Sequence, residues 1–107
     1  MKKILFIILT IISIKSFGQN YNFDQGVKAF KENDYETAIK YFDIAIEDNP
    51  KEPISYYYRS IIYKTYEQYS YALRDITSSI KLISNKEKEL LSGAYQLRAT
   101  IYFSIEK

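Results

Sequence analysis

Cysteine and histidine are absent from this chain of 107 residues, and only three glycines are present. Without histidine or cysteine, the chain lacks the commonest general base, the thiolate nucleophile and the usual ligands of transition metals. The glycines, at positions 18, 26 and 93, form no glycine-rich phosphate-binding loop. We therefore expect no enzyme activity, no cofactor and no metal site. Without disulfides, packing alone has to stabilise the fold.

Four carboxylates on predicted helices remain as candidates for acid–base chemistry. Glu32 and Glu36 form one helix-spaced pair, and Asp43 and Glu47 form another. Each pair could in principle supply an acid and a base. Basic residues such as Lys40 lie beside them, so we interpret these carboxylates as solvated groups in helical ion pairs.

The N-terminus has the pattern of a secretory signal peptide. Two lysines precede an apolar run over residues 4–14, and small residues, Ser16 and Gly18, occupy the two positions that a signal peptidase inspects. We predict a signal peptide over residues 1–18, cleavage before Gln19, and export to the periplasm, the cell surface or the medium. The run is too short for an ordinary membrane-spanning helix, which needs about 20 apolar residues. The alternative is an uncleaved anchoring segment, the one case in which we expect membrane contact.

Charge is unevenly distributed in the remaining chain. Removal of residues 1–18 takes away three lysines and changes the net charge from +2 to −1. Residues 19–52 carry four basic and eight acidic side chains, whereas residues 53–107 carry eight basic and five acidic ones. Most of these charges we expect on solvated faces, although the asymmetry could also steer partners or favour head-to-tail association. Export and the net charge argue against a nucleic-acid partner.

A repeat of 34 residues runs through the rest of the chain. Tyr35 and Ala38 recur as Tyr69 and Ala72, and the same offset relates residues 26 and 60 and residues 45 and 79. A fixed period of this length indicates stacked helical hairpins. Such units cannot each bury their apolar face alone, so they stack and leave an extended surface for binding.

The residues of these units resemble the tetratricopeptide repeat. In the first unit Ala38, Phe42, Ala45 and Pro50 match the second helix and closing turn of that family, while Tyr56-x2-Arg59-Ser60-x2-Tyr63 fits the first helix of the second unit. A third first-helix copy, Tyr95-x2-Arg98-Ala99-x2-Tyr102, follows at an offset of 39 residues. The resemblance implies an all-α, TPR-like α-solenoid of about two and a half helix-turn-helix repeats within a domain over residues 19–107. The repeats cover about residues 19–52 and 53–86, and residues 87–107 form a half repeat.

Small side chains at the repeat positions are expected where helix axes approach closely, with larger side chains filling the gaps. The small residues are Gly26, Ala38, Ala45, Ser60, Ala72, Ser79 and Ala99; the larger ones are Phe42, Tyr63, Ile76 and Tyr102; Pro50 closes the first unit.

Helix boundaries can be placed from capping residues. We predict helices over about 21–32, 35–48, 53–66, 69–83 and 85–105, and no strand. Asp34 is a good N-cap, and Pro53 suits a first helical position. Ser84 and Glu87 have the spacing of a capping box, which predicts an early start and unusual length for the last helix.

The first helix of each unit lines the concave surface in tetratricopeptide arrays, and this resemblance implies a groove for a protein or peptide. Its predicted residues are Phe23, Val27 and Phe30, then Ile54, Tyr57, Ile61 and Lys64, then Gln96, Thr100 and Phe103. This surface is aromatic and apolar, which suits an extended peptide or an amphipathic helix.

Three functions follow from these patterns. We favour an exported scaffold or adaptor that binds proteins through the groove. The first alternative is a structural assembly subunit that self-associates through its uncapped last helix, over residues 85–105, where apolar residues have no following helix to pack against. The second is a glycan-binding module that uses exposed tyrosines as stacking platforms.

Overall fold

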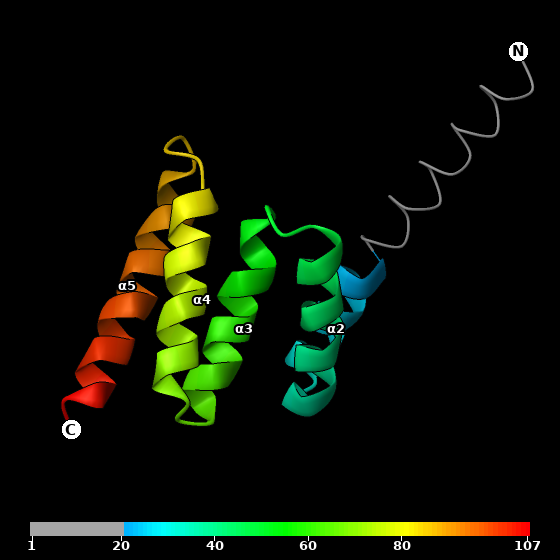
Figure 1. The fold of residues 1–107 in the computed structure, drawn as a ribbon, viewed down its shortest axis with the longest axis horizontal. Coiled ribbons are helices and arrows are strands. Elements are labelled where there is room, and N and C mark those ends of the chain that lie inside the picture. The colour runs from blue at the N-terminus through cyan, green and yellow to red at the C-terminus, as the bar shows by residue number, and fades with distance from the viewer. Residues whose placement is uncertain (1–20) are drawn as a thin grey trace, which may run out of the picture.

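The computed structural model describes residues 21–107 as a stack of helices lying side by side (Figure 1). Residues 21–31 are helical and are followed by α2 (Tyr35–Asp48), α3 (Pro53–Thr65), α4 (Tyr69–Leu82) and α5 (Lys88–Ile105). Every regular element in this part of the chain is a helix, so the predicted all-α, TPR-like repeat fold is confirmed. The predicted signal peptide and its cleavage site before Gln19 lie outside the described residues.

The N-termini of α2 and α3 are capped by carboxylates. Asp34 Oδ1 accepts a hydrogen bond from the backbone N–H of Thr37 at 3.2 Å, as predicted for an N-cap. Glu52 caps α3 with both carboxylate oxygens, which accept from the N–H groups of Ile54 and Ser55 at 2.8 Å each. Pro53 occupies the first helical position, where its missing N–H needs no partner. These caps explain why the predicted starts of both helices are correct.

The prediction of a capping box at the start of α5 is wrong. The Ser84 hydroxyl accepts from the N–H of Lys86 at 3.2 Å, and the N–H of Glu87 donates to the Ser84 carbonyl at 3.0 Å. These bonds form a turn, which competes with capping for the same hydroxyl. The helix therefore begins at Lys88 instead of residue 85, with Glu87 as an N-cap that makes no side-chain cap bond.

The predicted unusual length of the last helix is confirmed. α5 has 18 residues, whereas α3, its counterpart in the preceding unit, has 13. Of the five residues that separate the 39-residue offset from the 34-residue period, four extend the start of the helix and one lengthens the connection before it. Leu90 and Leu91, in this added part, pack against the core cluster.

The first helices of units one and two end in the same turn, 34 residues apart. Asn33 and Glu67 have left-handed backbone with φ of 62° and 60°. In each turn the next residue's N–H donates five residues back, from Asp34 to the Ala29 carbonyl at 2.9 Å and from Gln68 to the Tyr63 carbonyl at 2.8 Å. This pattern is the Schellman motif, which usually places glycine at the left-handed position.

Two hydrophobic clusters form the core. One contains Ala29, Ala38, Phe42 and Ile62, and the other contains Ala72, Ile76, Ile83, Ala94 and Ile101. Close packing leaves no room at Gly26, because a Cβ there would lie 2.7 Å from Cε1 of Phe42. The hydroxyls of two buried serines also bridge helices: Ser60 Oγ donates to the Ala72 carbonyl at 2.8 Å, and Ser79 Oγ donates to the Pro53 carbonyl at 2.9 Å.

The structure buries most of the predicted repeat positions but not all of them. Gly26, Ala38, Phe42, Ala45, Ser60, Ala72, Ile76 and Ser79 are buried, Tyr63 is partly buried, and Pro50 is exposed. The expectation fails at Ala99 and Tyr102, which are both exposed. On α5 only the face with Ala94 and Ile101 packs inward, onto α4 and α3, and none of the helices within residues 21–107 covers the opposite face.

Candidate functional site

The centre of the predicted groove lies on one face of α3. Ile54, Tyr57, Ile61 and Lys64 follow one another at spacings of three and four residues, which places them on the same side of a helix. All four are partly buried. Tyr57 packs against the second core cluster, whereas Ile54 and Ile61 are in neither cluster among the described residues. The two isoleucines therefore keep apolar surface that the core does not use.

Tyr57 also connects α3 to α5. A Cβ added to Gly93 would lie 2.9 Å from the Tyr57 hydroxyl oxygen, so the phenol lies directly against the backbone of α5. Burial raises the pKa of Tyr57, because the charged phenolate loses hydration there. Tyr57 is thus fixed between two of the helices that form the predicted groove.

The predicted groove residues of the first unit are largely used for packing between units. Phe30 lies 4.9 Å from Tyr58, centroid to centroid, and Phe23 lies 6.4 Å from Tyr58 and 6.2 Å from Phe42. Tyr58 in turn stacks on Phe42 at 5.2 Å with only 5° between the ring planes. Val27 packs against the same cluster. Phe23, Val27 and Phe30 are therefore partly buried, and they offer less free surface than the prediction assumed.

The groove residues of the third unit are open to solvent. Gln96, Thr100 and Phe103 are all exposed, and Phe103 retains 59% of its surface. Thr100 donates its hydroxyl hydrogen to the Gln96 carbonyl at 2.9 Å. The ammonium group of Lys107 lies 4.6 Å from the centre of the Phe103 ring. Accessible apolar surface therefore lies toward α5 rather than toward residues 21–31.

A buried ion-pair network fixes the opposite side of α3 and was missed by sequence reasoning. Arg59 Nε and Nη2 donate to the two carboxylate oxygens of Asp75 on α4 at 2.7 and 2.8 Å. Arg59 Nη1 donates to Asp43 on α2 at 2.9 Å. The rings of Tyr56 and Tyr63 lie within 6 Å of the guanidinium, at 5.9 and 5.8 Å. One side chain thereby connects three helices.

The contacts of Arg59 determine the direction in which its pKa shifts. Burial alone would lower the pKa of Arg59, but the hydrogen bond and charge of Asp75, together with Asp43, outweigh it and raise the pKa. Asp43 is solvated as expected, with 54% of its side chain exposed, but its ion-pair partner is Arg59 on α3 and not the expected Lys40 on its own helix. A separation of 16 residues in each pair gives no local signal; only the common repeat register could have aligned these side chains.

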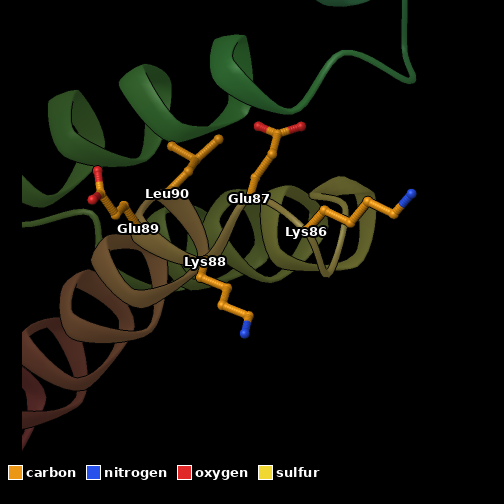
Figure 2. Close-up of a pocket in the computed structure, with 5 residues that line it drawn as sticks. All are labelled: Lys86, Glu87, Lys88, Glu89 and Leu90. Atoms are coloured by element: carbon orange, nitrogen blue, oxygen red, sulfur yellow. The ribbon is translucent and has the colours of Figure 1, made fainter.

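An open hollow of about 520 Å³ lies at the start of α5. Figure 2 shows Leu90 and Glu87 directed toward the neighbouring helix and Lys88 directed away. A smaller depression of about 160 Å³ includes Gln25 and Tyr41. Neither includes a residue of the predicted groove.

Within residues 21–107, no group of acidic side chains is arranged to hold a metal ion, and none of the helices there has the length and apolarity to cross a membrane.

Comparisons with known proteins support a likeness to tetratricopeptide proteins. The chain is 44% identical over 71 residues to serine/threonine-protein phosphatase 5 of Homo sapiens, a match that covers 66% of this chain and 13% of that protein. The protein of the same name from Rattus norvegicus matches equally. A TPR repeat-containing protein of Methanocaldococcus jannaschii, MJ1428, is 34% identical over 61 residues, covering 57% of this chain and 11% of that protein. No family model matches.

These matches concern a small part of the relatives. The aligned residues span about an eighth of the curated proteins they match. The matched regions are tetratricopeptide repeat domains, which are non-catalytic and imply protein partners in general.

Proposed function

We propose that the chain is an exported adaptor that binds a protein or peptide through a groove centred on α3. The observation that carries this proposal is the apolar surface of Ile54 and Ile61, which are partly exposed and lie outside both core clusters of the described residues. Tyr57 between them is held against α5, so the surface is preorganised. Preorganised apolar anchors favour binding because little side-chain entropy is lost.

The chemistry of the groove indicates the kind of ligand. Ile54, Tyr57 and Ile61 suit apolar side chains presented by an extended peptide or by one face of an amphipathic helix. Lys64 continues the same face, and residues 53–107 carry more basic than acidic side chains. We propose a ligand with two or three apolar anchors and at least one carboxylate.

A pull-down from the cell envelope tests the groove. In Ile61→Lys the groove carries a charge, and we expect the captured partner to be lost. Ile44→Lys is the control, because Ile44 is an isoleucine with 43% exposure that lies on α2, away from the proposed groove. Loss of the partner with Ile61→Lys alone supports the proposal, and equal capture by both variants contradicts it.

Export is proposed from the pattern of residues 1–18 and needs its own test. Mass spectrometry of the chain recovered from cells should show an N-terminus at Gln19. An intact Met1 on protein recovered outside the cytoplasm would favour the anchoring segment, and a chain found only in the cytoplasm would contradict export. Neither result depends on the groove.

Glycan binding through Tyr57 is less favoured by the geometry. Tyr57, the groove tyrosine, is partly buried and lies against Gly93, so its ring is poorly accessible for stacking on a sugar.

A further inference from the structure

The outer face of α5 carries the residues that pack against a following helix in the preceding unit, but no helix covers it in the described part of the chain. Tyr95, Arg98, Ala99 and Tyr102 repeat the positions of residues 56, 59, 60 and 63 on α3. On α3 this face is covered by α4, and Ser60 is fully buried there. On α5 the same positions are open: Tyr95 retains 48% of its surface and Tyr102 retains 53%.

The exposed residues of this face form a regular seam. Its members alternate at spacings of four and three residues, the pattern of core positions in a coiled coil. The seam residues are Lys88, Ser92, Tyr95, Ala99, Tyr102 and Glu106, and all are exposed. α5 lies at the opposite end of the stack from residues 21–31 (Figure 1), and the seam residues are exposed in the described part of the chain.

The seam is complementary to itself when a second copy runs in the opposite direction. With the two-fold axis at residue 97, Lys88 lies opposite Glu106 of the copy, and Tyr95 lies opposite Ala99 of the copy. Ser92 then lies opposite Tyr102 of the copy. Each layer joins a large side chain to a small one or a positive charge to a negative one, as core packing and charge pairing require. A parallel pairing would instead place lysine on lysine and tyrosine on tyrosine.

We propose that α5 pairs with α5 of a second copy of this chain in this antiparallel register. Symmetry produces each of the three layers twice, and the resulting contact is isologous. The seam differs from the predicted groove residues on α5, which are Gln96, Thr100 and Phe103. Dimerisation therefore goes beyond the proposed adaptor function and does not depend on it.

Arg98 limits the strength of this pairing. Its substitution also distinguishes pairing with a second copy from covering by a helix that resembles α4. The register brings the two copies of Arg98 near the axis, where like charges repel. Arg98 lies over its own Tyr95 ring, with Cζ 5.2 Å from the centroid. Arg98→Gln should therefore strengthen the dimer. A covering helix that resembled α4 would instead present a carboxylate to Arg98, as Asp75 does to Arg59, and Arg98→Gln would weaken that contact.

Charge exchange tests the register. In sedimentation equilibrium of the purified chain we expect a monomer–dimer equilibrium. Lys88→Glu and Glu106→Lys should each weaken it about tenfold, because two attractive pairs become repulsive. The double variant should restore the wild-type constant. A wild-type chain that stays monomeric at all accessible concentrations overturns the proposal, and so does a double variant no better than the single ones. Far-UV circular dichroism checks that these exposed substitutions leave the fold intact.

Disulfide trapping tests the direction. The chain has no cysteine, so introduced thiols are the only ones present. Under mild oxidation, a mixture of Ser92→Cys and Tyr102→Cys chains should give covalent heterodimers, whereas each variant alone should give few homodimers. Efficient homodimers of Ser92→Cys alone would indicate a parallel pairing and overturn the proposed one.

Discussion

Arg59 on α3 holds Asp75 on α4 through two parallel hydrogen bonds of 2.7 and 2.8 Å, and both side chains are largely buried. Bidentate pairs of this kind are strong and geometrically specific. The pair also contacts α2, since Arg59 bonds Asp43, whose side chain remains 54% exposed. Arg59 therefore fixes the relative positions of α2 and α4, the helices on either side of α3.

Removal of Asp75 should destabilise the fold strongly. Asp75→Asn leaves the largely buried guanidinium with only the exposed Asp43 as a charged partner, and breaking a buried pair typically costs about 3 to 5 kcal/mol. Urea unfolding followed by circular dichroism measures this loss. Asp43→Asn is the control, because an exposed partner contributes at most about 1 kcal/mol. Equal losses of unfolding free energy in the two variants would contradict the larger contribution that we assign to the buried Asp75.

Relief of backbone strain at Glu67 should stabilise the fold. Glu67→Gly places glycine at a φ of 60°, which glycine adopts without steric cost. We expect the unfolding free energy to rise by about 0.5 to 1 kcal/mol, since the gain is partly offset by the greater freedom of glycine when unfolded. Thermal unfolding is the measurement. Glu67→Ala should give no such gain, because alanine also disfavours this conformation. An equal gain in both variants would show that the left-handed backbone at residue 67 is not the source of the gain.

The two helical glycines of the described region should respond differently to alanine. In Gly26→Ala the new Cβ would lie 2.7 Å from the Phe42 ring, and overpacking of this kind costs about 1 to 3 kcal/mol. In Gly93→Ala the new Cβ meets the hydroxyl end of Tyr57 at 2.9 Å, which can move. Helix propensity favours alanine by about 1 kcal/mol, so Gly93→Ala should be neutral or stabilising. Chemical unfolding should show a loss of stability for Gly26→Ala and no loss for Gly93→Ala, and equal effects of the two substitutions would contradict this difference.

Stability should fall in alkali because of buried phenols. Burial raises the pKa of Tyr57 above 10.0 in the folded chain. A raised pKa means that the folded state holds the proton more tightly, so the stabilisation is complete below pH 10 and is lost as the pH rises through the folded pKa. Unfolding free energies measured from pH 8 to pH 11 should decrease at the upper end, and less steeply in Tyr57→Phe. An unchanged slope in this variant would assign the effect to other groups.

Much of the fold could be predicted from the sequence because the repeat imposes a register. The 34-residue period located the helices and placed Ala38 and Ala72 at positions that the structure buries completely. Local chemistry was sufficient for the Asp34 cap, because a cap needs only residues three positions apart. The repeat register and the local cap could therefore both be predicted without knowledge of which distant side chains meet.

The remaining features depend on neighbours that a local pattern does not reveal. Phe30 was assigned to the groove, but Tyr58 from the next unit packs on it. Tyr102 was expected to fill a gap, yet no described helix forms the other wall of that gap. The Arg59–Asp75 pair joins side chains from two helices, so its charges look like ordinary surface charges in the sequence.

The added length of α5 has a consequence for local motions at that end of the stack. Its first turns place Leu90 and Leu91 against the cluster that contains Ile83, the C-cap residue of α4. Asn49, the counterpart of Ile83 one period earlier, is exposed. Amide protons in the last turn of α4 should therefore exchange with deuterium more slowly than those in the last turn of α2, because packing of α5 disfavours local unfolding of that turn.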